Sequence, residues 1–275
     1  LLSGDLTDSG SLTKALQTSQ PHEVYNLAAQ SFVAASFEIP IHTGDVTGLG
    51  ALRLFEAVRQ TCPSARVYQA SSSEQFGNTL MTPQDEQTLF QPVSPYGCAK
   101  TFAHLSAQVY RKASHLFVAC GIAFNHESPR RGEEFVTRKI SRAVAMIHAG
   151  KQDLLRLGNL SARRDWSHAR DISRGAWMLL QQPTPEDFVL ASGESHRVQE
   201  FVEQAFDAVG LEWEKYVVQN VPAFTRPTDV QDLCGSAGKA NRILGWRPTV
   251  TFAQLVQEMV AYDCDALLGD SLRSR

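Results

Sequence analysis

The 275-residue chain has few cysteines, and they do not form a recognisable set. Their positions are Cys62, Cys98, Cys120, Cys234 and Cys264. No two of them have the C-x-x-C spacing, and none joins histidines at a metal-binding spacing, so the sequence predicts no metal site. An odd, scattered set is typical of reduced thiols, and we therefore expect a cytoplasmic protein.

The chain also lacks long apolar runs and an excess of charge of either sign. No uninterrupted apolar stretch is long enough to span a membrane, and no basic region followed by an apolar core opens the sequence. Lysine and arginine together number 26 against 29 acidic residues, a formal net charge of -3. We therefore expect no membrane or nucleic-acid partner, and a hydrophobic content of 43% is ordinary for a soluble protein.

Short apolar runs alternate with helical patterns along the chain. Strands are predicted at 24–29, 65–70, 116–124 and 188–191. Helices are predicted from a cap at Asp8 to a stop at Pro21, at 41–62, 95–114 and 135–149, from a cap at Asp171 to 180, and at 198–209, 238–244 and 252–268. This alternation predicts an α/β fold with a doubly wound parallel sheet of the Rossmann type.

One absence bears on this fold. A dinucleotide-binding sheet begins with a strand, a glycine-rich turn and a helix, and the turn lets the backbone approach a pyrophosphate. Neither G-x-G-x-x-G nor G-x-x-G-x-x-G occurs near the start, and Gly44, Gly48 and Gly50 follow no predicted strand. We expect that the missing segment precedes Leu1 in a longer polypeptide.

Polar clusters follow three of the predicted strands. They are Gln30-Ser31, the run from Ser71 to Glu74, and the run from Asn125 to Arg131. Because ligands bind beyond the carboxyl ends of the strands in such sheets, these clusters predict a site at that edge.

Tyr96 and Lys100 stand four residues apart, after a proline suited to the first position of a helix. On a helix, positions i and i+4 lie on one face, so the ammonium can approach the phenol. Tyrosine normally titrates near ~10, and a neighbouring cation lowers its pKa. The pair is therefore suited to taking a proton from an alcohol, although the spacing alone is a weak signal.

With these residues in view, the chain resembles the extended short-chain dehydrogenase/reductase superfamily, and within it the GDP-mannose 4,6-dehydratase family. The resemblance rests on segments 4–8, 25–31, 69–74, 94–100, 124–132, 135–139, 157–160, 164–166 and 226–228. The run Asn125 to Gly132, Asn-His-Glu-Ser-Pro-Arg-Arg-Gly, is the most specific of them, because related sugar-nucleotide dehydratases and epimerases lack it.

The resemblance implies a reaction. GDP-mannose would become GDP-4-keto-6-deoxymannose, with NADP carrying a hydride from C4 to C6 and with loss of water. Tyr96 would take the C4 hydroxyl proton, Ser72 would bond that hydroxyl, and Glu74 would take the C5 proton. A carboxylate near a tyrosine base suits such acid–base work.

The resemblance also implies a division of the site residues. The implied catalytic residues are Ser72, Glu74, Tyr96 and Lys100. The implied NADP contacts are Asp5, Leu6, Leu27, Ala28, Ala29, Gln30, Ser31, His42, Lys100, His126 and Arg131. The implied substrate contacts are Ser73, Asn125, Lys139, Gly158, Asn159, Arg164, Arg226 and Asp229. The arginines suit a diphosphate, because a guanidinium can form two charge-assisted bonds to it.

The same resemblance implies two parts of the chain and an oligomer. Residues 1–130 and 168–193 would form the dinucleotide-binding domain, without its first βαβ segment. Residues 131–167 and 194–275 would form a smaller mixed α/β lobe that binds the sugar nucleotide. Family membership implies a homodimer or homotetramer.

Three positions depart from the pattern of the family. Ser72 stands where threonine is frequent, Asp229 where glutamate is common, and His42 where some relatives have tyrosine. Either hydroxyl can do the work of the first position, and none of the three departures removes chemistry.

Two alternatives stay open. A related reductase or epimerase would need the Tyr96/Lys100 pair but not Glu74, and both Glu74 and the run from Asn125 to Gly132 argue against it. A non-catalytic fragment is favoured only by the missing glycine-rich turn, and the complete set of catalytic residue types argues against it.

Overall fold

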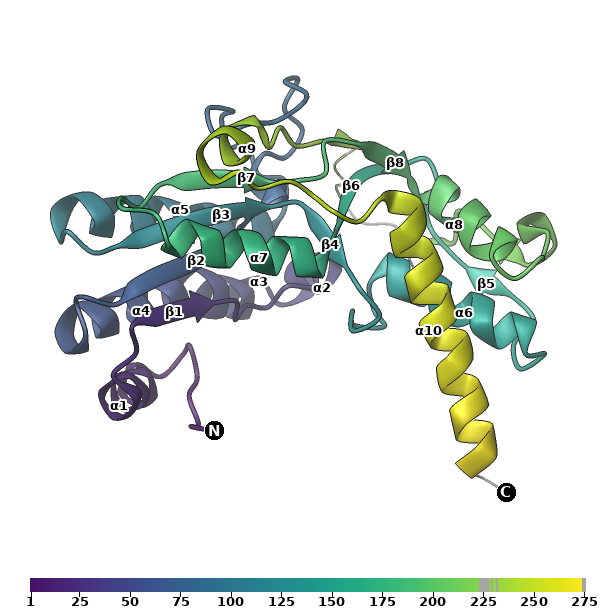
Figure 1. Cartoon of the computed structure of the whole chain (residues 1–275), viewed down its shortest axis with the longest axis horizontal. Coiled ribbons are helices and arrows are strands. Elements are labelled where there is room, and N and C mark those ends of the chain that lie inside the picture. The colour runs from purple at the N-terminus through teal and green to yellow at the C-terminus, as the bar shows by residue number, and fades with distance from the viewer. Residues whose placement is uncertain (223–227, 229, 231, 274–275) are drawn as a thin grey trace.

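Four parallel strands form the main sheet in a computed structural model that describes residues 1–222, 228, 230 and 232–273 (Figure 1). In sheet order they are β1 (Glu23–Asn26), β2 (Arg66–Ser72), β3 (Val118–Ala123) and β7 (Asp187–Leu190). The sheet confirms the α/β class. The first strand is shorter than predicted, because pairing with β2 ends at Asn26, and the residues from 27 to 31 follow it outside the sheet.

Helices cover both faces of this sheet. The alternation of side chains along β2 sends Val67 into one apolar cluster and Tyr68 into another. The first cluster is closed by α1 (Ser9–Ser19), α4 (Gly50–Thr61) and α5 (Pro95–Ala113), and the second by α7 (Ala169–Leu180) and α9 (Gly238–Leu244). Figure 1 shows α7 in front of the strands and α5 behind them. This arrangement confirms the doubly wound sheet.

The segment between β1 and α4 is less regular than predicted. A single helix was predicted over 41–62. The structure has α2 (Val33–Glu38), α3 (Pro40–Thr43) and a π-helical turn, η1 (Gly44–Leu49), before α4. A side chain on Gly50 would lie 2.7 Å from Cβ of Leu6, and one on Gly48 would touch Phe102. These two glycines therefore allow close packing rather than a phosphate-binding turn.

A smaller lobe lies beside the main sheet (Figure 1), and its segments come both before and after β7 in the chain. Its strands are β4 (Asn125–Glu127), β6 (Arg163–His168) and β10 (Asp232–Leu233) in parallel, β8 (Ser195–Arg197) antiparallel to β6, and the pair β5 (Leu155–Arg156) and β9 (Val217–Val218). Its helices are α6 (Val136–His148), α8 (Val198–Asp207) and α10 (Phe252–Arg273), and it contains the short 3₁₀ turn η3 (Trp213–Lys215). A second 3₁₀ turn, η2 (Ser73–Gln75), follows β2 in the main sheet. An apolar cluster from α6, α8, α10 and β6 forms the core of the lobe.

One local prediction was wrong. The N-cap of α7 is His168, whose Nδ1 accepts a hydrogen bond from the Arg170 amide at 2.9 Å. Asp171 lies in the first turn instead, where its carboxylate accepts the Thr249 amide at 2.7 Å. Helix α9 packs on the main sheet, although it falls within the predicted lobe range 194–275. Among the described residues, no helix is both long and apolar enough to cross a membrane.

Candidate active site

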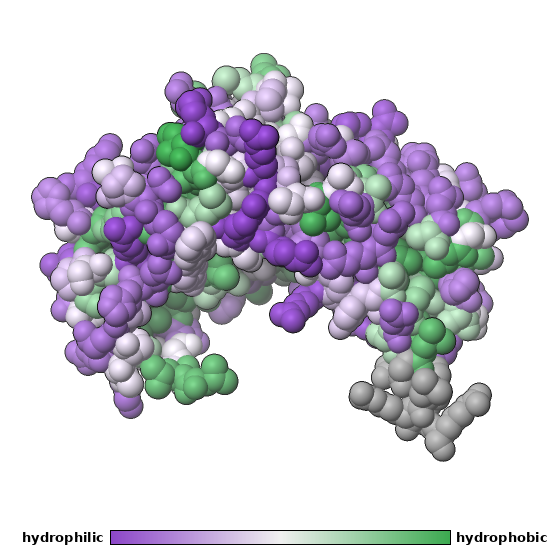
Figure 2. Space-filling view, in the orientation of Figure 1, coloured by the Kyte–Doolittle hydropathy of each residue, from purple (hydrophilic) through white to green (hydrophobic). Residues whose placement is uncertain are grey.

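A cavity of about 1250 Å³ lies at the carboxyl ends of the main strands, where the sheet meets the smaller lobe. Figure 2 shows the surface hollowed between the two lobes. Most of the predicted site residues line this cavity: Leu27, Ala29, Ser31, Ser72, Ser73, Glu74, Tyr96, Lys100, Asn125, His126, Arg131, Lys139, Gly158, Asn159 and Arg164. Residues from distant parts of the sequence thus converge as the strand-end argument predicted.

Tyr96 is buried at the start of α5, where Ser94 caps the helix and Pro95 takes its first position. Its hydroxyl shares a hydrogen bond with the Ser72 side chain. The pKa of Tyr96 is raised to about 12, mainly by burial; the Ser72 bond and the Arg131 charge lower this pKa, and the Glu74 charge raises it. The sequence predicted a lowered pKa, and this was wrong because the cost of burying a phenolate outweighs these attractions.

Lys100 lies one turn along the same helix, as predicted. Its Nζ lies 5.8 Å from the centre of the Tyr96 ring and donates a hydrogen bond to the Ala70 carbonyl at 2.8 Å. Burial lowers the pKa of Lys100 to about 8. The ammonium is therefore held by the backbone of β2 and points its charge toward the cavity wall that carries Tyr96.

Ser72 and Glu74 are fixed by the turn that ends β2. The Ser72 hydroxyl accepts the Glu74 amide at 3.3 Å, and the Gln75 side chain accepts the Ser72 amide at 2.8 Å. Such reciprocal bonds satisfy the free amides of a helix start. Both Ser72 and Glu74 are buried, so the turn holds a hydroxyl and a carboxylate at defined positions in the cavity.

Gly97 brings this turn against the start of α5. A side chain at Gly97 would lie 2.7 Å from the Glu74 carbonyl oxygen and 3.0 Å from Pro92. Only glycine permits this approach without a shift of the backbone. The position of Tyr96 relative to Glu74 therefore depends on a close contact between the backbone at Gly97 and the backbone carbonyl of Glu74.

Basic side chains also line the cavity. Lys139 lies on α6, and partial burial lowers its pKa. Arg164 lies on β6 and is buried, and its guanidinium donates hydrogen bonds of 2.8 Å to the carbonyls of Arg163 and Val230. Together with Arg131 they supply cationic groups suited to an anionic ligand, and Glu127, Glu133 and Glu134 line the same cavity.

Residues 125–131, which follow β3, contribute His126 and Arg131 to the cavity. His126 Nδ1 bonds the Phe124 carbonyl at 2.9 Å, and burial lowers the pKa of His126. Arg131 forms an ion pair with Glu127 at 3.2 Å and lies over the Phe135 ring, 3.5 Å from its centre. The arginine is thereby held between a carboxylate and an aromatic face.

Several predicted contacts do not line the cavity. They are Asp5, Leu6, Ala28, Gln30 and His42. Asp5 accepts the amide and hydroxyl of Thr7, each at 2.7 Å, and those bonds lower its pKa. Ala28 and Gln30 stand between residues that do line the cavity, and the roles of all five stay predictions. Arg226 and Asp229 lie outside the described residues.

Glu127 and Phe135 were not predicted, although both line the cavity. Thr137 donates to Glu127 at 2.6 Å, and burial raises the pKa of Glu127 against the pull of Arg131. A signal existed for Glu127, because it lies within the specific run from Asn125 to Gly132. The ion pair between Glu127 and Arg131, four residues apart, could not be predicted from the sequence.

Several solved structures share this fold. The structure of RMD from Pseudomonas aeruginosa complexed with NADPH has a TM-score of 0.88 at 24% identity, over 96% of this chain and 88% of that chain. DesIV, a dTDP-glucose 4,6-dehydratase from Streptomyces venezuelae solved with NAD and TYD, has a TM-score of 0.82 at 23% identity, over 94% and 77%. At these identities the likeness shows the fold alone, a Rossmann-type α/β fold.

A family model described as GDP-mannose 4,6 dehydratase matches residues 1–259. GDP-mannose 4,6 dehydratase 2 of Arabidopsis thaliana is 52% identical over 265 residues, covering 95% of this chain and 70% of the plant protein. The GDP-mannose 4,6 dehydratase of Homo sapiens is 47% identical over 283 residues, covering 96% and 76%. The chain belongs to the GDP-mannose 4,6-dehydratase family.

Proposed function

We propose that the protein dehydrates GDP-mannose to GDP-4-keto-6-deoxymannose. The observation that carries the proposal is the convergence of Tyr96, Ser72 and Glu74 in one cavity that Lys139, Arg164 and Arg131 also line. Relatives that share about half of the sequence are named for this reaction, which supports the choice of substrate.

The residues around the cavity fit NADP as the cofactor. Lys100 has three donors, and the Ala70 carbonyl accepts one of them, so the ammonium can also bond a ribose hydroxyl. His126 and Arg131 offer polar contacts, and the predicted residues at 27–31 offer a backbone path after β1. When bound, NADP supplies a reversible acceptor of hydride, so no external reductant is needed.

Tyr96 would take the proton of the C4 hydroxyl, which Ser72 orients. The shared hydrogen bond between Ser72 and Tyr96 supports this pairing, because it sets both oxygens at the same point of the cavity wall. Arg131 assists by favouring the charged form of Tyr96.

Glu74 would take the proton from C5 once C4 is a ketone and would pass a proton to the C6 hydroxyl, which would leave as water and leave a C5=C6 double bond. Return of the hydride to C6 and of a proton to C5 would then give the 6-deoxy product and the oxidised cofactor. A carboxylate is the appropriate acceptor here, because the ketone acidifies the neighbouring C–H bond. The burial of Glu74 next to Ser72 supports the role, since a water-excluded base is held in one geometry.

The GDP half would lie against the basic side chains of the cavity. Lys139 and Arg164 would pair with the diphosphate, and Ser73, Asn125, Gly158 and Asn159 would contact the nucleotide or sugar. Arg226 and Asp229 are part of the same proposal.

The larger arrangement is also a proposal. Residues 1–130 and 168–193 would bind the cofactor and the remaining residues the substrate, with α9 joined to the first part by its packing. We further propose a cytoplasmic homodimer or homotetramer.

The test is a product assay with purified protein, GDP-mannose and a small amount of NADP. The proposal predicts a keto sugar nucleotide lighter by one water, with no net reduced cofactor at the end. A product of unchanged mass would indicate an epimerase instead, and consumption of added NADPH would indicate a reductase.

A further inference from the structure

A buried hydrogen-bond network lies directly behind the catalytic end of β2. The Ser71 hydroxyl and His104 Nδ1 are 2.8 Å apart, and both residues are buried. Ser71 lines the cavity and precedes Ser72 in the chain. His104 belongs to α5, two turns beyond Tyr96.

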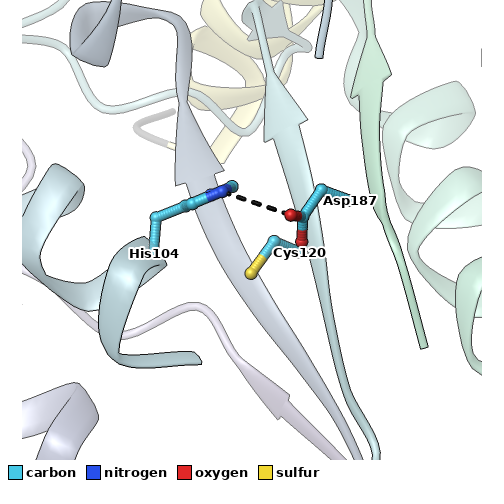
Figure 3. Close-up of side chains that lie close together, drawn as sticks. All are labelled: His104, Cys120 and Asp187. Carbon is cyan, nitrogen blue, oxygen red and sulfur yellow. Dashed lines mark ion pairs between the residues drawn. The ribbon is translucent and has the colours of Figure 1, made fainter. Parts of the chain in front are cut away.

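The second ring nitrogen of His104, Nε2, also has polar neighbours. Nε2 lies 3.2 Å from Nε2 of Gln108 and 3.4 Å from Oδ2 of Asp187, and Gln108 donates to the same carboxylate oxygen at 2.9 Å. Arg111 donates to the other Asp187 oxygen at 2.5 Å. Figure 3 shows His104 reaching from α5 toward Asp187 across the strand that carries Cys120.

An aromatic contact also constrains the His104 ring. The Phe90 ring meets His104 edge-on, with the ring centres 4.9 Å apart. His104 therefore joins the helix that carries Tyr96 to both β2 and β7.

A metal site is the other possible interpretation of this cluster, because His104, Cys120 and Asp187 place possible ligand atoms within 4.8 Å of one another. Arg111 opposes it, since its guanidinium is bound to Asp187 and lies 4.0 Å from the Cys120 sulfur. Burial also raises the pKa of the Cys120 thiol, which disfavours the thiolate that a metal needs. The arginine already occupies the place of the cation.

We propose that His104 is a positioning residue that holds Ser71, and through it Ser72, at the catalytic end of β2. The inference rests on the proposed function. Ser71 and Ser72 are consecutive, so a movement of the Ser71 backbone would also displace Ser72, whose hydroxyl bonds Tyr96. His104 touches no substrate, because Ser71 stands between it and the cavity.

Two variants of His104 can separate the contact made by Nδ1 from the contacts made by Nε2. The side-chain amide of asparagine lies as many bonds from Cα as Nδ1 does, and that of glutamine as many as Nε2. His104→Asn can therefore keep the bond to Ser71, whereas His104→Gln keeps only the contact with Gln108 and Asp187.

We expect His104→Gln to lower kcat roughly tenfold, within the ~10²-fold that a small misplacement can cost, with little change in the KM for GDP-mannose. His104→Asn should regain most of kcat. Ser71→Ala should equal His104→Gln, and the double variant should be no worse than either. His148→Asn, at an exposed position of α6, is the matched control and should leave kcat unchanged.

A second measurement does not depend on turnover. Hydrogen exchange of the Ser72 amide should accelerate at least about tenfold in His104→Gln but not in His104→Asn, because positioning is lost only in the former. Equal kinetics and equal exchange in the two variants would overturn the inference. A wild-type protein that makes no dehydrated product would refute the proposed function instead, and the exchange experiment would still decide the role of His104.

Discussion

At the scale of residues, the chemistry of the cavity depends on ionisable groups that the fold has removed from water. Tyr96 and Lys100 are both buried, and burial moves their pKa values in opposite directions, to about 12 and about 8. The uncharged forms are favoured in both cases. The Ser72 bond and the Arg131 charge lower the pKa of Tyr96 and so partly offset the effect of burial.

Tyr96→Phe should abolish the oxidation of C4 while leaving nucleotide binding nearly unchanged. The ring keeps its shape in this variant, but the proton acceptor is lost. Stopped-flow absorbance of reduced cofactor in a single turnover measures the step. Tyr110→Phe removes a hydroxyl from the same helix outside the cavity and serves as the control. Normal formation of reduced cofactor in Tyr96→Phe would remove the tyrosine from the mechanism.

Lys100→Met should change how stability depends on pH. The folded pKa of Lys100 lies near 8 against an ordinary 10.5, so the unfolded chain binds more protons between these values and stability rises with pH there. The shift corresponds to about 3 kcal/mol. The free energy of unfolding from urea titrations at pH 7 to 10 should rise less in Lys100→Met than in the wild type.

Lys112→Met is the matched control, because Lys112 lies exposed in the last turn of the same helix. Its curve should run parallel to that of the wild type. If the curve of Lys100→Met is also parallel, then Lys100 keeps an ordinary proton affinity in the folded protein.

At the scale of elements, the site depends on the contact between the start of α5 and the turn that ends β2. The helix begins at Pro95 behind the Ser94 cap, and Gly97 lies against the Glu74 carbonyl. The capping turn of Ser72 and Gln75 fixes the other partner. Tyr96 and Glu74 are thus placed by two short backbone segments.

Gly97→Ala should therefore destabilise the fold by roughly 1–3 kcal/mol, as overpacking typically does, and should lower kcat. Urea unfolding and steady-state kinetics measure the two effects. Gly44→Ala has nothing within 4 Å of the added carbon, so it should be neutral or stabilising by about 0.4–1 kcal/mol. Equal behaviour of the two variants would show that the close approach at Gly97 has no consequence.

Local patterns predicted the elements better than they predicted the electrostatics. The helix at 95–114 could be predicted because proline and a periodic apolar face are local signals, and the structure ends it one residue earlier, at Ala113. The π-helical turn at Gly44–Leu49 could not, because it depends on packing against α5. The pKa of Tyr96 was predicted in the wrong direction, since burial is a property of the whole fold. The pairing of Glu127 with Arg131 escaped prediction for the same reason.

At the scale of the whole molecule, the cavity lies where the main sheet and the smaller lobe meet, so both parts must be stable for the site to exist. The lobe contains a buried ion pair between Arg138 of α6 and Asp263 of α10, and the Ser141 hydroxyl donates to Asp263 at 2.7 Å. This pair joins the first helix of the lobe to the last helix of the chain.

Asp263→Ala should lower the free energy of unfolding by about 3–5 kcal/mol, because it leaves Arg138 buried without its partner. Arg142, which lies on the same helix as Arg138, forms an exposed pair with Glu133. Arg142→Ala breaks this pair, and such pairs contribute about 0–1 kcal/mol. Urea unfolding compares the two variants. A loss at Asp263 as small as that at Arg142 would mean that the buried pair is not part of the lobe's stability.

The central claim is that Glu74 takes the C5 proton, which separates a dehydratase from a reductase or an epimerase. Single-turnover reaction in D₂O, following cofactor absorbance and deuterium at C5, tests it most directly. Glu74→Gln keeps the shape of the side chain and leaves Tyr96 untouched. It should form reduced cofactor and the 4-keto sugar, yet exchange C5 more slowly by ~10²–10⁴-fold, the usual worth of a general base. Rapid C5 exchange or normal product formation in Glu74→Gln would contradict the account.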